Sequence, residues 1–331
     1  MRVSKICGLA GMMGRGFVHE DMKAFQELLQ LSGMRGIDST GVYFVRTEDK
    51  KLMYFEKKSL QNSLAFVDMY SWSKTTFLYK TDFNVYMAHT RSGTAGRATI
   101  DNAHPFNLSR YVGAHNGTLY DWEYYFDDSK KDRTDSEMMF QKMDDLGEGG
   151  VKEVLDGLSA ESAYAVTIFD KVKRKMIFAR NRHRPLFVGV SKKRPIIYWA
   201  SDQDYLTFVN KRWNLDMEVY FFQPFKMYTV DVNTLQKGDM KPWVVEDLKE
   251  RAEKTRNTVT VWKPPVDEVL RINSTSGATS VVTPASVTNP MDLIGAPVLD
   301  APVMISGVTD YFNATDKDDA DIDWNQVANF Q

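Results

Sequence analysis

Residues 163–200 read AYAVTIFDKVKRKMIFARNRHRPLFVGVSKKRPIIYWA, and this stretch decides the fold class of the chain. It divides into four runs rich in β-branched and aromatic residues, AYAVTIF, KMIFAR, PLFVGV and PIIYWA, which are separated by short basic or proline-containing turns. Apolar runs of this composition, bounded by turn residues, are typical of β-strands. The stretch therefore predicts a succession of strands.

Helices and strands come in separate blocks on the N-terminal side of this stretch. Residues 20–32 (EDMKAFQELLQLS) carry their apolar residues on one helical face, and residues 134–147 open with the capping pattern of a second helix. Between them, residues 42–46 and 52–57 are two β-rich runs joined by a polar turn, which is typical of a hairpin. The arrangement in blocks favours an α+β fold with antiparallel sheet over a doubly wound parallel sheet.

The C-terminal side has a different character. Residues 219–232 (VYFFQPFKMYTVDV) predict a final pair of strands, and residues 245–255 carry a short helical pattern. We expect residues 241–331 to form a polar tail, largely extended or disordered, because they are rich in Ser, Thr, Asn, Pro and Asp. The C-terminus of this tail mixes aspartates with aromatic residues, so two interpretations stay open: a solvated end, or a segment that docks in a groove of a partner protein.

Composition limits the class of protein. The chain has 331 residues, of which 43% are apolar, and its 42 basic and 44 acidic side chains give a net charge of -2. It therefore has enough apolar residues for a sizeable core and no global charge that would attract nucleic acid or an anionic membrane. It also lacks an apolar run of the roughly 18 residues that a membrane span needs. A single cysteine excludes an internal disulfide, and we expect a cytoplasmic protein.

The single cysteine, Cys7, lies in the stretch SKICGLAGMMG, residues 4–14. A lone cysteine is more often a small buried hydrophobe than a nucleophile. Gly8 and Gly11, however, permit the close approach of another group, which a purely structural strand residue does not require. Cys7 is therefore a candidate nucleophile as well as a candidate core residue.

Four further motifs each end a β-like run with a turn, where side chains and backbone N–H groups can converge on a pocket. With the cysteine motif they read CGLAG (7–11), RGIDSTG (35–41), HTRSGTAG (89–96), HNGTL (115–119) and TDSE (134–137). Together with NAHPF at 102–106, and with FARNRHRPLFVG and WASD further along, they resemble the glutaminase domain of class II glutamine amidotransferases, which are N-terminal-nucleophile hydrolases. The resemblance implies a four-layer αββα sandwich of two antiparallel sheets, and we expect it to occupy residues 7–240.

The resemblance also implies how the chemistry is divided. Cys7 would be the nucleophile, which forms a glutamyl thioester and releases ammonia, and its base would be the free α-amino group of the same cysteine, with a pKa near 8 (about 7.7–8.0). Asn116 and the Gly117 backbone N–H would form the oxyanion hole. Only cleavage of the Ile6–Cys7 bond frees that amine, so we expect residues 1–6 to be a leader that is removed; the alternative is a retained leader.

Substrate recognition is implied for four more residues. The planar fork of Arg91 matches the α-carboxylate of L-glutamine, and Asp135 can take its α-ammonium group. Thr94 would belong to the glutamine-binding loop, and Arg35 would support the cysteine end of the site. Without the motifs, Arg91 and Asp135 would be read as ordinary surface or paired charges, and the Asn-Gly dipeptide as a type I′ turn.

Two substitutions depart from the family pattern. Ser92 and Ala95 stand where many members have Trp and His, so the loop over glutamine lacks an aromatic lid. This puts the affinity for glutamine, or its coupling to ammonia use, in question. His89, His104 and His115 fit no compact ligand spacing, and no glycine-rich phosphate loop is present, so we expect no metal site and no cofactor.

Two functions of different classes follow from these motifs. The first is an enzyme that hydrolyses glutamine and supplies ammonia to a separate synthase or acceptor subunit, or that acts on another γ-glutamyl compound. The residues after 240 are too few and too polar for a fused synthase domain. The second is a catalytically silent amidotransferase-like module that keeps its leader and binds or regulates a partner.

Overall fold

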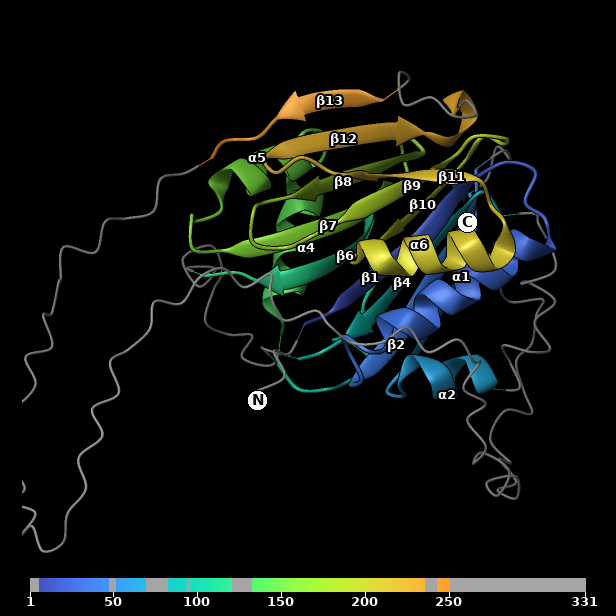
Figure 1. The fold of residues 1–331 in the computed structure, drawn as a ribbon. Helices are drawn as coiled ribbons and strands as arrows, with labels where there is room; N and C mark the ends of the chain where they lie inside the picture. Colours follow the sequence, from blue (N-terminus) through green and yellow to red (C-terminus); the bar gives the residue numbers. More distant parts are fainter. Residues whose placement is uncertain are drawn as a thin grey trace, which may run out of the picture. The chain divides into compact units, whose positions relative to one another are not determined.

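The computed structural model describes residues 6–47, 52–69, 83–93, 96–120, 133–235 and 243–250. These residues form two antiparallel β-sheets with helices on the outer face of each sheet (Figure 1). The α+β class and the sandwich of two antiparallel sheets are therefore confirmed. Thr94, Ala95, nearly all of the expected leader and the tail beyond residue 250 lie outside the described residues.

Sheet A contains the cysteine strand at its centre. Its strands are, in spatial order, β11 (Met217–Phe221), β9 (Phe187–Ser191), β10 (Ile196–Ala200), β1 (Gly8–Gly14), β4 (Val85–Arg91), β2 (Ser39–Arg46) and β3 (Met53–Ser59). Strand β1 pairs with β10 on one side and with β4 on the other. Only glycine fits at position 11, because a Cβ atom there would lie 2.1 Å from the ring of Trp199.

Sheet B carries two of the four strands that the opening stretch predicts, β7 and β8, together with the HNG strand, whereas the other two, β9 and β10, belong to sheet A. Its spatial order is β13 (Val244–Asp247), β12 (Lys226–Asp231), β8 (Lys175–Arg180), β7 (Ala163–Asp170), β6 (Tyr111–Thr118) and β5 (Phe106–Asn107). Every pairing in both sheets is antiparallel. The chain passes from sheet B to sheet A in the loop between β8 and β9.

Helices cover the outer faces of the sheets. Alternate side chains along each strand point either toward the helices or toward the other sheet. Helices α1 (His19–Ser32), α2 (Ser63–Asp68) and α6 (Gln203–Trp213) pack on sheet A, whereas α4 (Asp135–Leu146) and α5 (Gly150–Gly157) pack on sheet B. In β1, Ala10 and Met12 face α1, while Leu9 and Met13 face sheet B. This period of two residues is what a strand between two apolar layers requires.

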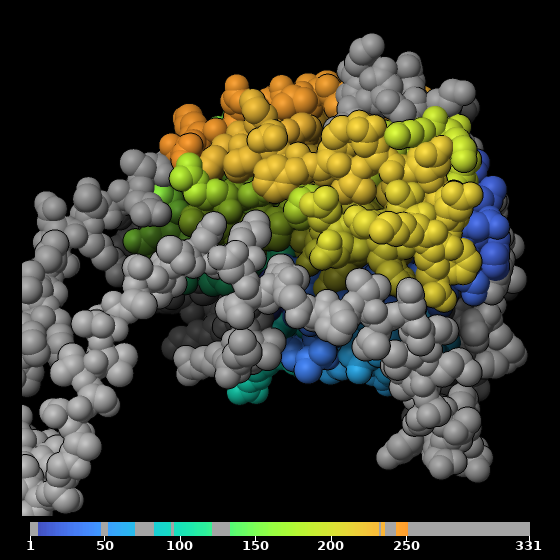
Figure 2. All heavy atoms as spheres, in the orientation of Figure 1, coloured from blue at the N-terminus to red at the C-terminus, as the bar shows by residue number. Residues whose placement is uncertain are grey.

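Residues 219–232 form two strands as predicted, but three details of the fold differ from the sequence predictions or were missed by them. Strands β11 and β12 do not pair with each other, because β11 joins β9 in sheet A and β12 joins β8 in sheet B. The helical pattern at 245–255 begins as strand β13, whose pairing with β12 overrides the local helical periodicity. Helix α6 was not expected, although Asp202 caps it by accepting a hydrogen bond from the backbone N–H of Asp204. In Figure 2, β12 and β13, drawn in gold and orange, lie at the surface.

No helix among the described residues is long and apolar enough to cross a membrane.

Candidate functional site

The motif residues meet at one end of both sheets. In sheet A this end holds the start of β1, the end of β4 and the end of β10, since Gly8 lies opposite Thr90 and Ala10 opposite Ala200. In sheet B it holds the end of β6 and the start of β7, and α4 begins nearby. Segments far apart in sequence therefore contribute to one site.

Cys7 is 8% exposed and lies directly before β1. Its thiol is bracketed by the backbone of Ser92: the Ser92 N–H donates to Sγ at 3.3 Å, and Sγ faces the Ser92 carbonyl oxygen at 3.5 Å. Burial raises the pKa of the thiol to about 11, against the lowering effects of the Ser92 N–H and of the charge on Arg91. The thiol in this state is protonated at neutral pH and needs a base before it can attack a substrate.

The RGIDSTG motif builds the wall beside the cysteine. Arg35 donates from Nε to the Cys7 carbonyl at 3.1 Å, and its guanidinium lies 3.6 Å from the Asp202 carboxylate. Asp38 accepts a hydrogen bond from the Gly93 N–H at 2.6 Å, which fixes the loop after β4. The RGIDSTG motif alone gave no indication of this role for Asp38.

Arg91 is the last residue of β4 and is 3% exposed. Its guanidinium donates to the carbonyl oxygens of Arg97 at 3.2 Å and Gly96 at 3.3 Å, so it organises the loop that follows the strand. Gly36 packs directly against this backbone, because a Cβ atom there would lie 2.5 Å from the Arg91 carbonyl carbon. Arg91 is therefore held in the site from both sides.

Asn116 and Gly117 lie within strand β6, opposite Ala165 and Tyr164, and not in a type I′ turn. The turn interpretation is wrong because the run of strand pairing continues through both residues to Thr118. The Asn116 amide reaches across to sheet A, where Nδ2 lies 3.5 Å from the hydroxyl of Ser201. Its Oδ1 atom is buried and has no hydrogen-bond partner within the described residues.

Asp135 begins α4 and is 4% exposed. One carboxylate oxygen accepts from the Leu119 N–H at 2.8 Å, and the other accepts from the Ser136 N–H at 2.9 Å. The Ser136 hydroxyl also lies 3.4 Å from the second oxygen. A carboxylate has about four lone-pair sites, so these contacts leave room for a further donor such as an ammonium group. Both Asp135 and Arg91 act electrostatically on the Cys7 thiol.

Three histidines are buried behind this end of the sheets. His89 donates from Nε2 to the His115 carbonyl at 3.0 Å, and the His89 and His104 rings lie 4.1 Å apart. Burial lowers the pKa of all three, to about 3 for His89, so each imidazole is neutral at neutral pH. The described residues hold no cluster of three or more metal-ligating side chains.

Arg184 was not assigned a role by sequence, although it lies in the quoted FARNRHRPLFVG motif. It sits in the loop between β8 and β9, which Asn181 anchors by accepting from the Tyr164 and His183 N–H groups. Its Nε atom is buried and lacks a hydrogen-bond partner within the described ranges. Burial lowers the pKa of the Arg184 guanidinium, against the charge of the Cys7 thiolate. Arg184 is thus a further cation at the site.

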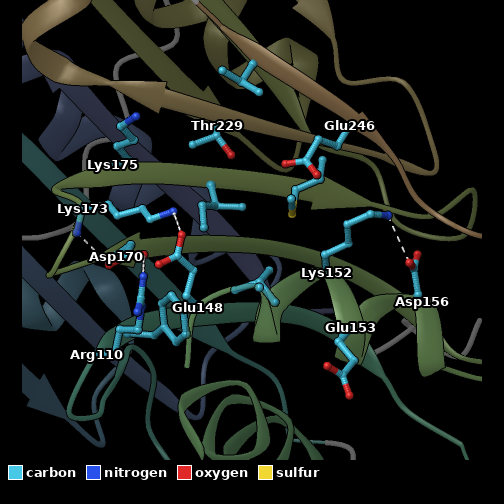
Figure 3. A pocket seen from close by; sticks show the side chains of 16 residues that line it. Arg110, Glu148, Lys152, Glu153, Asp156, Asp170, Lys173, Lys175, Thr229 and Glu246 are labelled. Carbon is cyan, nitrogen blue, oxygen red and sulfur yellow. Dashed lines mark hydrogen bonds and ion pairs between the residues drawn. The ribbon is translucent and has the colours of Figure 1, made fainter. Parts of the chain in front are cut away.

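Two cavities in the described residues lie away from Cys7. The larger, of about 610 Å³, is a groove on the outer face of sheet B between α5 and the strands β8, β12 and β13 (Figure 3). Most of the charged side chains around the groove form ion pairs, such as Lys152 with Asp156 and Arg110 with Asp170. The second cavity, of about 360 Å³, lies near the end of α5. Neither contains a residue assigned to the reaction.

Comparison with curated proteins finds glutamine–fructose-6-phosphate aminotransferases among the similar proteins. The glutamine–fructose-6-phosphate aminotransferase of Streptococcus pyogenes serotype M6 is 28% identical over 200 residues, which are 56% of this chain and 31% of the relative. The corresponding protein of Bradyrhizobium diazoefficiens is 29% identical over 195 residues, again 56% of this chain and 30% of the relative. The chain thus spans about a third of the length of these relatives. No protein-family model matches it.

Comparison with solved structures supports the fold. The structure of the allosteric regulatory enzyme of purine biosynthesis matches with a TM-score of 0.53 and 20% identity, covering 74% of this chain and 50% of that one. The curated relatives are glutamine amidotransferases, so the resemblance that the motifs indicate is confirmed.

Proposed function

We propose that this chain hydrolyses the side-chain amide of L-glutamine through Cys7 and passes the ammonia to an acceptor held by a separate protein. One observation carries the proposal: Cys7 and Arg91 on the sheet A side, Asn116 in sheet B and Asp135 at the start of α4 lie at the same end of the two sheets. These are the groups that attack on an amide, oxyanion stabilisation and recognition of a free amino acid require.

The proposed reaction begins with transfer of the thiol proton to the α-amine of Cys7. Sγ then attacks the amide carbon of glutamine, and the carbonyl oxygen becomes an oxyanion. The amine returns the proton to the leaving nitrogen, ammonia departs, and a glutamyl thioester remains. Water hydrolyses this thioester to glutamate and restores the thiol, so no external oxidant or reductant is needed.

The sheet geometry supports an oxyanion hole at Asn116 and Gly117. Tyr164 lies opposite Gly117, and both its backbone N–H and its carbonyl form hydrogen bonds with Asn181. The Gly117 N–H therefore points away from β7 and is not used in the pairing of β6 with β7. Rotating the Asn116 amide lets the Ser201 hydroxyl donate to Oδ1 and frees Nδ2. Ser201 can do this because its oxygen already accepts from the Leu9 N–H at 2.9 Å.

The proposal requires cleavage of the Ile6–Cys7 bond. In the uncleaved chain the Cys7 nitrogen is an amide, which cannot accept a proton. Removal of residues 1–6 creates an amine next to the guanidinium of Arg35, which binds the Cys7 carbonyl. A nearby cation favours the neutral form of an amine, which is the form that acts as a base.

The first test is the intact mass of untagged protein, measured together with ammonia release from glutamine. We expect a mass that lacks residues 1–6 and a release of ammonia that 6-diazo-5-oxo-norleucine, a glutamine analogue with an electrophilic carbon, blocks by adding to Cys7. A processed chain that releases no ammonia from glutamine would contradict the proposal.

The second candidate function is a catalytically silent module that keeps its leader. For the uncleaved chain, the protonated thiol of Cys7 favours this candidate. Burial raises the pKa of the Cys7 thiol to about 11, and no basic side chain among the described residues hydrogen-bonds to Sγ. An intact mass of residues 1–331 in protein from its native host would support this candidate.

A further inference from the structure

His115 connects four elements behind the site. It precedes Asn116 in β6 and is 1% exposed. Its Nδ1 lies 2.8 Å from the Ser136 hydroxyl in α4, and its Nε2 lies 3.4 Å from the Ala163 carbonyl oxygen in β7. Its own carbonyl accepts the hydrogen bond from His89 in β4 of sheet A. One side chain and its peptide unit therefore link both sheets and α4.

The glycine of the HNG motif makes this arrangement possible. A Cβ atom on Gly117 would lie 1.8 Å from the Ala163 carbonyl oxygen and 2.5 Å from His115 Nε2. Any side chain at this position would push the imidazole away from α4 or separate β6 from β7. The three residues of the motif therefore act together: the histidine reaches α4, and the glycine leaves the space for it.

The first turn of α4 is attached to β6 at two places. Asp135 accepts from the Leu119 N–H, which follows the Asn116–Gly117 pair, and Ser136 bonds to His115, which precedes it. The two bonds thus span the proposed oxyanion hole. They leave α4 little freedom to shift relative to that part of β6.

The partners of His115 decide which nitrogen carries its proton. The Ala163 carbonyl can only accept, so a hydrogen bond to it at 3.4 Å requires Nε2 to be the donor. Nδ1 then accepts from the Ser136 hydroxyl at 2.8 Å, and that hydroxyl proton is directed at the ring instead of at the Asp135 carboxylate oxygen 3.4 Å away. Burial lowers the pKa of His115, with the Asp135 charge acting in the opposite direction, so the ring carries one proton at neutral pH. The charged groups that face it are Asp135 on α4 and Arg184 on the loop before β9.

We infer that His115 and Ser136 are positioning residues, which through their hydrogen bond fix the Asp135 carboxylate relative to Asn116 and Gly117. The inference rests on the proposed function, in which Asp135 takes the α-ammonium group of glutamine. The network sets the distance between the ammonium pocket and the oxyanion hole, and so the length of amino acid that fits between them.

Two substitutions at His115 each keep one of its two side-chain hydrogen bonds and remove the other. The amide of His115→Asn reaches the place of Nδ1 and keeps the contact with Ser136, whereas that of His115→Gln reaches the place of Nε2 and keeps the contact with Ala163. We expect His115→Gln to raise KM for glutamine about tenfold, the usual worth of one hydrogen bond, and to change kcat less. His115→Asn should keep KM within about threefold of the parent value.

Ser136→Ala removes the hydrogen bond between Ser136 and His115 by deleting the hydroxyl, and it disturbs the core less than a substitution of His115 does. Ser136→Ala should raise KM for glutamine about tenfold. The double variant Ser136→Ala with His115→Gln should have the same KM as either single variant, because all three variants lack the same hydrogen bond. Ser191→Ala is the matched control: this serine is buried and hydrogen-bonded, but it lies in β9 away from the site. Its KM should not change.

A substrate without the α-amino group tests the link to Asp135. For glutaramate, which is glutamine lacking that group, Ser136→Ala should change kcat/KM less than twofold. Equal losses for the two substrates, additive effects in the double variant, or equal KM values for the two His115 variants would overturn the inference. Thermal melting of each variant shows that it is folded.

A further measurement does not depend on turnover. The ¹⁵N resonance of His115 Nδ1 reports its hydrogen bond directly, and we expect it to move in Ser136→Ala but not in Ser191→Ala. An unchanged resonance would overturn the inference. Failure of the parent protein to hydrolyse glutamine, with the resonance shifting as expected, would instead contradict the proposed function.

Discussion

The two halves of the site are held by different kinds of contact. In the sheet A half, the Cys7 thiol is contacted by backbone groups, because the N–H and carbonyl of Ser92 bracket Sγ, while the Cys7 carbonyl accepts from the side chain of Arg35. In the sheet B half, side chains do this work, with His115 bound to Ser136 and Asn116 directed at the Ser201 hydroxyl. A backbone contact survives many substitutions, but a side-chain contact does not.

The departure from the family pattern at Ser92 lies in the first of these halves. Ser92 replaces the tryptophan of many class II members, and it lies in the half where the contact to the thiol uses only the main chain. The HNG and TDSE motifs of the other half match the pattern throughout. The contrast can be tested by substitutions on each side.

The largest effect should come from Cys7 itself. Cys7→Ala removes the nucleophile and should lower kcat for glutamine by at least about a thousandfold, because the remaining groups only bind and polarise the amide. Ammonia release under saturating glutamine measures this loss. The melting temperature should change little, since alanine is a smaller apolar residue at a place already fixed by backbone contacts. Retained turnover in Cys7→Ala would show that another group attacks.

Asn116→Ala should have the next largest effect. Loss of one oxyanion-hole donor costs about 10²–10³ in kcat, with a smaller change in KM. The variant also removes an amide whose Oδ1 is buried without a partner within the described residues, so the protein should not lose stability. Steady-state kinetics and thermal melting together check both statements. A change confined to KM would place Asn116 outside the oxyanion hole.

Acid should destabilise the protein through the three buried histidines behind the site, of which His89 lies in sheet A and His115 in sheet B. The pKa values of His89, His104 and His115 are lowered by burial in the folded protein, whereas the unfolded values lie near 6.5. Their contribution to stability is therefore complete above about pH 6.5 and is lost as the pH falls toward the folded values, by up to roughly 1.4 kcal/mol per pH unit for each histidine. Denaturant unfolding between pH 7 and 5 should show this slope. A flat profile would mean that the imidazoles are hydrated in the folded state.

The smallest effects should come from a matched pair of buried serines beside the site. Ser201→Ala leaves the Leu9 N–H without its acceptor and should cost about 1–3 kcal/mol of unfolding free energy. Ser92→Ala keeps the N–H and carbonyl that contact Sγ, so the kinetics and the free energy of unfolding should stay close to those of the parent. Equal losses in the two variants would remove the distinction between side-chain and backbone contacts.

Much of this architecture could be predicted from sequence because its signals are local. The strands at 163–200 and the helices over 20–32 and 134–147 follow from apolar periodicity and from the Thr134 cap, which accepts from the Glu137 N–H. The partner of a strand does not follow from such signals. Strands β11 and β12 are neighbours in sequence and enter different sheets, which only the packing of two layers decides.

The site shows the same limit. The motifs predict which residues meet, but not the links between them. Ser201 and Arg184 belong to quoted motifs, and their contributions depend on loops that return to the end of sheet A from elsewhere. The role of Ser92 could not be read from its side chain, because its backbone makes the contact to Cys7.

Strand β13 has a practical consequence for where this chain can be cut. A boundary drawn at residue 240 from composition would discard Trp243, which is 7% exposed and whose ring centroid lies within 6.2 Å of those of Phe178, Phe222 and Tyr228. It would also strip β12 of its neighbour and uncover a new sheet edge with aromatic rings beside it. Exposed edges of this kind pair with other chains. A fragment ending at 240 should aggregate, whereas one ending at 250 should remain monodisperse.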